Sequence, residues 1–259
     1  MFMKTMRLCC AIIALIAFMG CASHVVTPSG ADMARFGLAT SKQERQWNTE
    51  REIADVLDKA PLARFPGTIA IVRVQSAMAH SRSSGVSYGR GAYRVILTPT
   101  VEKEGHFETI HGLDQVNGAV RLNRLVLGSN LQSDKELRTA AARLHADLTL
   151  IYTINTEWTI DDDPKPLDKI TFGLARFRKI TVTSTATALL LGTHNGFVYA
   201  TAEVAKDKNY EDNAWNNSEQ IEEAGEALEQ QAFDGLVADF VTAWPRVLEQ
   251  YARGKEARR

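Results

Sequence analysis

The sequence has no cysteine after residue 21. Its three cysteines are Cys9, Cys10 and Cys21, and the rest of the 259 residues contain none. This absence excludes a disulfide framework and a thiolate metal cluster from the part of the chain that folds. A chain that avoids cysteine also suits an oxidising compartment.

An excess of charge of one sign is also lacking. Lys and Arg number 30, Asp and Glu number 31, and the formal net charge is -1. Loss of a leader containing Lys4 and Arg7 would make the remainder about two units more acidic. Proteins that bind nucleic acid gain much of their affinity by neutralising phosphates, so we expect no nucleic-acid partner.

Long hydrophobic runs are missing as well. The apolar run over residues 8–19 has about a dozen residues, whereas a membrane-spanning helix needs roughly 20. It follows Lys4 and Arg7, with no acidic residue before it. A positive segment followed by a short apolar run predicts a signal peptide over residues 1–20.

The segment Phe18-Met19-Gly20-Cys21-Ala22-Ser23 resembles the lipobox of bacterial lipoproteins. The resemblance implies cleavage before Cys21, diacylglyceryl (palmitate-type) acylation of its sulfur, and, with no Asp at residue 22, delivery to the outer membrane. Residues 21–40 would then be a lipidated tether, which we expect to be poorly ordered. The alternative is ordinary cleavage after Ala22, which would release a soluble protein.

Composition and periodicity predict one folded domain over residues 41–252 and a frayed tail over 253–259. An apolar fraction of 45% is typical of globular proteins, and no Pro-, Gly- and Ser-rich stretch divides the middle of the chain. Apolar residues recur at helical spacing in three segments. The second segment opens with the capping box Ser133 to Glu136. The third contains Pro245, which we expect to kink or divide the helix. The predicted helices are 41–60, 133–146 and 219–251. The predicted strands before the hairpin are 68–75, 93–97, 119–127 and 148–158, with a surface loop over 76–91.

A hairpin is predicted from 180 to 204. Its strands, 180–191 and 197–204, are separated by a turn in which Asn195-Gly196 suits a type I′ geometry. One face carries threonines and the other is apolar, so the apolar face should be covered. The threonine face consists of Thr181, Thr183, Thr185 and Thr187, and the apolar face of Val182, Ala186, Ala188 and Leu190. The threonine face is either a solvated surface or a flat surface for a partner. The fold class is therefore α/β (α+β), a mixed sheet with a hairpin in the C-terminal half, helices packed on it and a long closing helix.

Residues able to do chemistry form no recognised catalytic motif. The six histidines lie in no nucleophile elbow or zinc-helix spacing. His106 and His111 flank Glu108 in a pattern that suits a metal site, but we favour a solvated loop there. His145 at a helix end is interpreted as structural. Residues 161–163, three aspartates, read as a turn rather than a calcium loop. We therefore expect no catalytic residue, no cofactor and no metal ligand; Cys21 is the one predicted site residue.

The glycine-rich stretch and three aromatic residues each allow a structural and a functional interpretation. Gly85, Gly89 and Gly91 lack the Gly-Lys-Ser/Thr ending of a phosphate loop, so a flexible loop is the better interpretation. The aromatic residues Trp158, Trp215 and Tyr199 would be hot spots if they were exposed, but such side chains more often belong to the core.

Three segments carry a family resemblance: 141–152, 186–191 and 195–200. A helix ending in Ala-Asp leads into a strand, and a hairpin follows. This order resembles the curli-secretion lipoprotein CsgG, the amino-terminal domain of TolB and the lipoprotein activators of penicillin-binding proteins. The turn at 192–195 replaces the acidic turn usual in those families, and neither 76–105 nor 159–179 alternates as a pore-forming hairpin would. The resemblance implies a domain that binds envelope proteins and does no chemistry.

The sequence thus predicts a periplasmic lipoprotein that acts as a non-catalytic binding or assembly module, with the membrane as one partner, through acyl chains on Cys21, and an envelope protein as another. The first alternative is an envelope hydrolase with its site in the 76–91 loop. The second is a structural lipoprotein that self-associates.

Overall fold

The computed structural model describes residues 23–25, 30–31, 33, 36, 49–77, 86–97, 99–161, 178–212 and 218–252. The predictions for the signal peptide (1–20), for Cys21 and for the tail (253–259) lie outside these residues, as do Trp215, Gly85 and residues 162–163.

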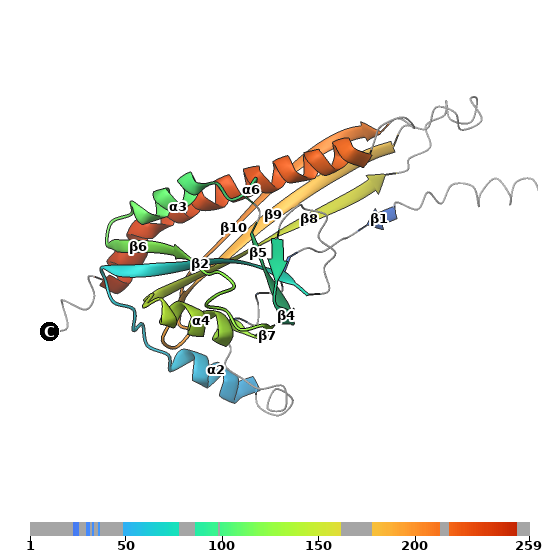
Figure 1. The fold of residues 1–259 in the computed structure, drawn as a ribbon. Coiled ribbons are helices and arrows are strands. Elements are labelled where there is room, and N and C mark those ends of the chain that lie inside the picture. Colours follow the sequence, from blue (N-terminus) through green and yellow to red (C-terminus); the bar gives the residue numbers. More distant parts are fainter. Residues whose placement is uncertain are drawn as a thin grey trace, which may run out of the picture.

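A twisted mixed sheet forms the centre of the protein (Figure 1). The main path runs β10-β9-β8-β2-β5-β3, and β1 and β6 pair with β8 and β2 respectively. The strands are β1 Ser23–Val25, β2 Gly67–Ser76, β3 Val86–Tyr88, β5 Tyr93–Leu97, β6 Val116–Arg121, β8 Leu148–Asp161, β9 Arg178–Gly192 and β10 Val198–Asp212. The short strands β4 Arg90–Gly91 and β7 Asn130–Leu131 make a separate pair. In the main sheet β2 is parallel to β6 and β8, and the other pairings are antiparallel.

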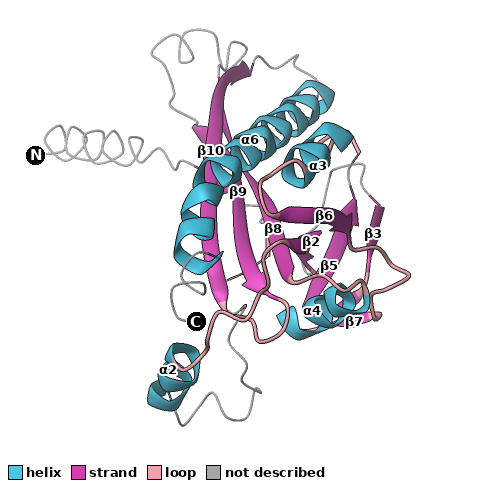
Figure 2. Cartoon of the chain, turned by 90° about the vertical axis from the view of Figure 1, so that its left-hand side faces the viewer, coloured by secondary structure: helices cyan, strands magenta, loops and turns pink. Residues whose placement is uncertain are grey.

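Helices cover both faces of this sheet. The long α6 and the short α3 lie on one face and α4 on the other (Figure 2). The bounds are α2 Thr49–Leu57, α3 Glu104–His111, α4 Asp134–Arg143 and α6 Ser218–Val247, followed by a π-helix over Leu248–Ala252. The predicted fold class, a mixed sheet with packed helices and a long closing helix, is confirmed.

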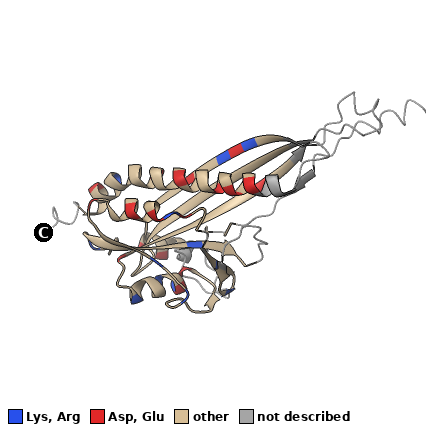
Figure 3. Ribbon diagram, turned by 45° about the horizontal axis from the view of Figure 1, so that its top comes forward, with Lys and Arg blue, Asp and Glu red and all other residues tan. Residues whose placement is uncertain are grey.

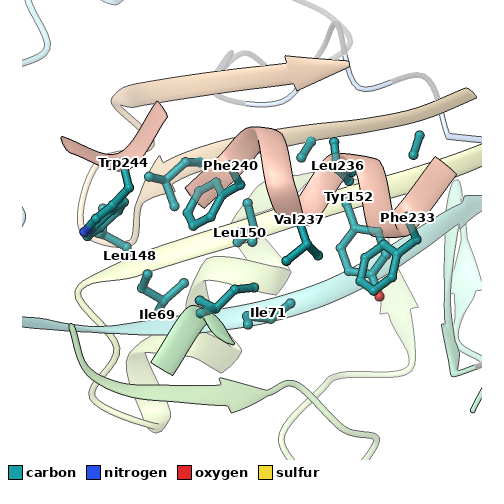
Figure 4. Packing of buried hydrophobic residues seen from close by; sticks show 14 of the residues in the cluster. Ile69, Ile71, Leu148, Leu150, Tyr152, Phe233, Leu236, Val237, Phe240 and Trp244 are labelled. Carbon is teal, nitrogen blue, oxygen red and sulfur yellow. The ribbon is translucent and has the colours of Figure 1, made fainter. Parts of the chain in front are cut away.

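The face under α6 holds the larger core. Alternate residues of each strand point to this side, and aromatic residues of α6 meet them (Figure 4). Phe233 stacks on Tyr152 with ring centroids 4.9 Å apart, and Trp244 is 2% exposed. The predicted apolar hairpin face is buried, with Ala186, Ala188 and Leu190 in this cluster and Val182 in a smaller one that reaches Leu228.

The opposite face has a second core, closed by α4. It includes Leu137 and Ala141 of α4 and Leu189 and Leu191 of β9. Two residues of the predicted tether, Ala31 and Phe36, are buried in it, and the Phe36 ring meets Tyr93 edge-on at 4.9 Å. At these two positions, apolar side chains of the predicted tether pack against a distant part of the sheet.

The hairpin is present, but its turn is not type I′. Gly196 has φ 69°, whereas Asn195 is not among the described residues with positive φ, and a type I′ turn requires two. The Gly196 N–H instead donates to the Gly192 carbonyl at 2.8 Å, so the turn spans five residues. Arg138 approaches closely enough that a Cβ on Gly196 would lie 3.3 Å from its Cζ. The Arg138 contact and the positive φ therefore both favour glycine.

Several predicted boundaries were wrong. The 76–91 loop contains β3 and β4, where positive φ at Gly89 and Gly91 lets short strands bend back. The predicted strand 119–127 ends at Arg121, and the helix opened by the Ser133 capping box ends at Arg143 rather than 146. In both cases apolar residues beyond the end of the element lie in turns and loops and are still buried. Their hydrophobic pattern therefore resembles a continuation of the strand or helix.

Two helices also differ from expectation. The described part of the first is α2, whose apolar residues Ile53, Val56 and Leu57 are exposed rather than packed. Pro245 does not divide α6: the helix continues past it to Val247 and then widens into the π-helix. A proline removes one helical donor, and a wider turn is one way in which a helix accommodates that loss.

Candidate functional site

An open groove of about 850 Å³ lies at the end of the sheet where the β9–β10 hairpin turns. Three segments far apart in sequence form it: residues 62–64, α4 (through Lys135, Arg138, Thr139 and Ala142) with residues 145–147, and the hairpin turn 193–195. The last two include parts of the segments that carry the family resemblance. The lining is apolar at Leu62, Ala63, Ala142 and Ala146 and polar elsewhere.

His145 lies at the edge of this groove in a left-handed conformation, with φ 55°. The Ala146 N–H donates to the Ala141 carbonyl and the His145 N–H to that of Ala142, both at 3.0 Å. These bonds end α4 in the manner of a Schellman motif, in which glycine usually takes the left-handed position. A histidine there accepts backbone strain and leaves its imidazole exposed beside the groove.

Two arginine–aspartate pairs organise the rim. Arg64 Nε donates to Asp147 Oδ1 at 3.1 Å, and the other oxygen of Asp147 accepts the Thr68 N–H at 3.3 Å. Arg138 Nε donates to Asp134 Oδ2 at 2.7 Å, and its Nη1 donates to the Thr193 carbonyl at 3.2 Å. The second pair ties α4 to the hairpin turn.

Residues 60–63 are fastened to the same turn and hairpin. Asn195 Nδ2 donates to the Ala60 carbonyl, and the Ala63 N–H donates to the Tyr199 hydroxyl, both at 2.8 Å. Burial raises the pKa of Tyr199 and lowers the pKa of Lys59, which lies near Asp134. The groove is therefore a preformed feature with cross-linked walls.

The residues that line the groove are mainly polar and basic. Arginine stays protonated in proteins, so in both Arg–Asp pairs it acts as a fixed positive charge and hydrogen-bond donor. Among the described lining residues, His145 and His194 are exposed and Thr193 bonds to Thr149 at 2.8 Å. Arg64, Lys135 and Arg138 line the groove together with one carboxylate, Asp147, which suits polar or acidic groups of a partner.

A buried polar network lies between the sheet and α6. Arg73 Nη2 donates to Glu229 at 2.9 Å, its Nη1 donates to Glu102 at 3.4 Å, and these side chains are at most 10% exposed. Burial opposes the charge of Arg73, yet Glu229 and Glu102 hold its pKa above the ordinary value. Because both ion pairs are buried and one of them joins β2 to α6, we read the network as a structural link.

The remaining members of the network are hydroxyls. Thr156 donates to Glu229 at 3.1 Å and is bonded to Ser184 at 2.9 Å, from the neighbouring strand. Burial raises the pKa of Tyr152 well above its ordinary value, and Glu102, its hydrogen-bond partner, adds to the effect. The network thus connects α6 to three strands.

The threonine face and the β10 edge are the other open surfaces. Thr181, Thr183, Thr185 and Thr187 are half-buried, and the neighbouring positions of β10 are exposed. Among the described strands, β10 pairs on one side only. It carries the charged residues Lys206, Asp207 and Lys208, which disfavour pairing of this edge with another strand (Figure 3).

The other sequence-predicted residues do not meet at a site. His106 and His111 lie in helix α3, not a loop; His106 Nε2 is 2.7 Å from Asp234 Oδ1, and its Nδ1 accepts the Lys103 N–H. No group of three metal-ligating side chains occurs among the residues that the structure describes. Tyr199 is buried and Trp158 is half-buried, so neither is an exposed hot spot.

Sequence reasoning missed the groove. The signal that could have indicated it was His145, a non-glycine residue two positions after the end of α4, but only the fold places the hairpin turn beside it.

Comparison with known proteins leaves the chain without a family. No family model and no curated protein matches it. Solved structures show distant likenesses. A DUF330 protein from Xanthomonas campestris has 11% identity and TM-score 0.32 over 75% of this chain and 93% of its own. A putative neuraminyllactose-binding hemagglutinin homolog from Helicobacter pylori has 7% identity and TM-score 0.34 over 75% and 95%. Lipoprotein GNA1162 from Neisseria meningitidis has 13% identity and TM-score 0.27 over 64% and 97%. At these values the likenesses carry no argument about function.

In the described part of the chain no helix has the length and apolar character needed to cross a membrane.

Proposed function

We propose that this protein is a non-catalytic binding or assembly module of the bacterial cell envelope, held at the outer membrane by acyl chains on Cys21 and facing the periplasm. The leader and lipobox-like segment support the anchor. The groove supports the binding role, because its walls are fixed by hydrogen bonds while its rim keeps exposed polar and basic groups.

The hydrolase alternative placed its site in the 76–91 loop. The described part of that loop is Ser76, Ala77 and residues 86–91, which include β3 and β4, and its histidine, His80, lies outside the described residues. The self-associating alternative would use the β10 edge, where Lys206, Asp207 and Lys208 disfavour strand addition. We favour the binding role because the groove combines fixed walls with exposed polar groups.

Photo-crosslinking in intact cells tests the groove as the partner site. A photoreactive residue at Ala142, exposed in the groove, should give a discrete protein adduct. The matched control is the same residue at Glu108, exposed on α3 on the other face. Reversal of the groove charge by Lys135→Glu in the same chain should reduce the Ala142 adduct several-fold. Equal adducts from both positions, or none from Ala142, would reject the groove as the contact surface.

A further inference from the structure

The first residues after the proposed lipid site are bound to the far end of the sheet. β1 pairs antiparallel with β8 so that Ser23 faces Ile160 and Val25 faces Trp158. Further along, the Gly30 N–H donates to Asn155 Oδ1 at 3.4 Å and the Ala31 N–H to Thr153 Oγ1 at 2.8 Å. Together with the buried Phe36, these contacts define a strap that runs from the tip of β8 towards the body.

The strap fixes where the anchor must be. Cys21 is two residues before Ser23, so their α-carbons can be no more than roughly 7 Å apart. Ser23 faces the penultimate residue of β8, where the same row of the sheet continues through Ile180 and Tyr210. The ends of β8 and β10 and the start of β9 therefore form one tip beside Cys21.

The groove lies at the other end of the same strands. The pairing of Leu148 with Gly192 marks the start of β8 and the end of β9, and the hairpin turn of the groove follows. A strand of 14 residues spans roughly 45 Å at about 3.3 Å per residue. Figure 1 shows β1 near the arrowhead of β8 and α2 and α4 at the opposite end.

We propose that the strap fixes the orientation of the folded domain on the membrane. The tip of β8, β9 and β10 meets the lipid surface, and the groove points into the periplasm, roughly 45 Å from the bilayer. This inference rests on the proposed lipidation of Cys21. A free tether of 20 residues would have a root-mean-square length of roughly 25 Å and leave the body free to turn. The docked strap removes that freedom.

The absence of cysteine after residue 21 provides a clean experiment. The lipidated full chain is reconstituted in phosphatidylcholine vesicles containing a phospholipid with a nitroxide quencher on its headgroup. A fluorophore is attached to one introduced cysteine, either Asn209→Cys or His194→Cys, both at exposed positions. Asn209 is level with His24 across β8 and β9, and His194 is in the turn at the groove.

The Asn209→Cys label should be quenched strongly and the His194→Cys label hardly at all. A variant that releases β1, His24→Pro with Val25→Pro, should reduce the difference, because adjacent amides of a strand point to opposite sides and one of the two must face β8. Equal quenching of both labels in the unmodified strap, or stronger quenching at 194, would overturn the orientation while leaving the anchor intact. Failure of the protein to bind vesicles at all would instead contradict the proposed lipidation.

Discussion

Arg73 shows how one side chain can link the layers of this protein. Its positive charge balances the negative charges of Glu102 and Glu229 in the interior of the protein. Glu102 comes from a loop and Glu229 from α6. Pairing of this kind is a weak source of stability as a whole, but removal of one partner leaves a buried charge unpaired.

We therefore expect Arg73→Met to lower the free energy of unfolding by about 3–5 kcal/mol. The matched control is Arg64→Met, whose side chain is 84% exposed and whose ion pair with Asp147 should contribute less than about 1 kcal/mol. Denaturant unfolding monitored by circular dichroism measures both changes. Equal losses in the two variants would show that the buried network does not act as described.

His145 presents the opposite case, a residue that stability alone would not select. Because its φ is 55°, His145→Gly should raise the free energy of unfolding by about 1 kcal/mol, whereas His145→Ala should not raise it, since alanine keeps the strain. Thermal unfolding of the two variants provides the comparison. A glycine variant no more stable than the alanine variant would contradict the strain argument.

Among the elements, the strap is the one that the chain's local sequence least suggests. Its contact with the second core depends largely on Phe36, which is 4% exposed and meets Tyr93. The antiparallel register of β1 with β8 adds backbone pairing at the tip.

Phe36→Ala should cost about 3–5 kcal/mol, because a buried aromatic side chain is lost and a cavity remains. Leu57→Ala on α2 serves as the control, since Leu57 is 78% exposed and its removal should change the free energy of unfolding by less than about 0.5 kcal/mol. Both are read from urea denaturation. If Phe36→Ala unfolds at the wild-type urea concentration, the strap is not part of the packed structure.

For the whole molecule, anchoring and folding should be separable. Cys21→Ser is expected to move the protein from the membrane fraction to the soluble fraction without a change in its thermal midpoint, since the lipid would attach outside the packed part of the chain. Fractionation of cells followed by thermal unfolding of the purified protein measures both properties. Retention of the variant in the membrane at the wild-type level would reject lipid attachment at Cys21.

Local patterns determined much of the fold. Alternation in 180–191 predicted which face of β9 is covered, and the Ser133 capping box placed the start of α4, where Ser133 and Glu136 bond to each other's backbone amides. Errors arose where burial continued beyond an element, as after Arg121, or where glycines allowed short strands, as at Gly89. In each case the same residue pattern fits both a regular element and a turn or loop, so the sequence alone does not distinguish them.

By itself, the sequence determined the mixed α/β class, the hairpin and the closing helix, because these follow from the spacing of apolar residues along the chain. Only the tertiary structure decided that residues 62–64, α4 and the hairpin turn meet in one groove, and that the strap lies on β8. Both depend on contacts between residues more than 50 positions apart, such as Arg138 with Thr193 and Ala31 with Thr153, and no local period encodes such pairings.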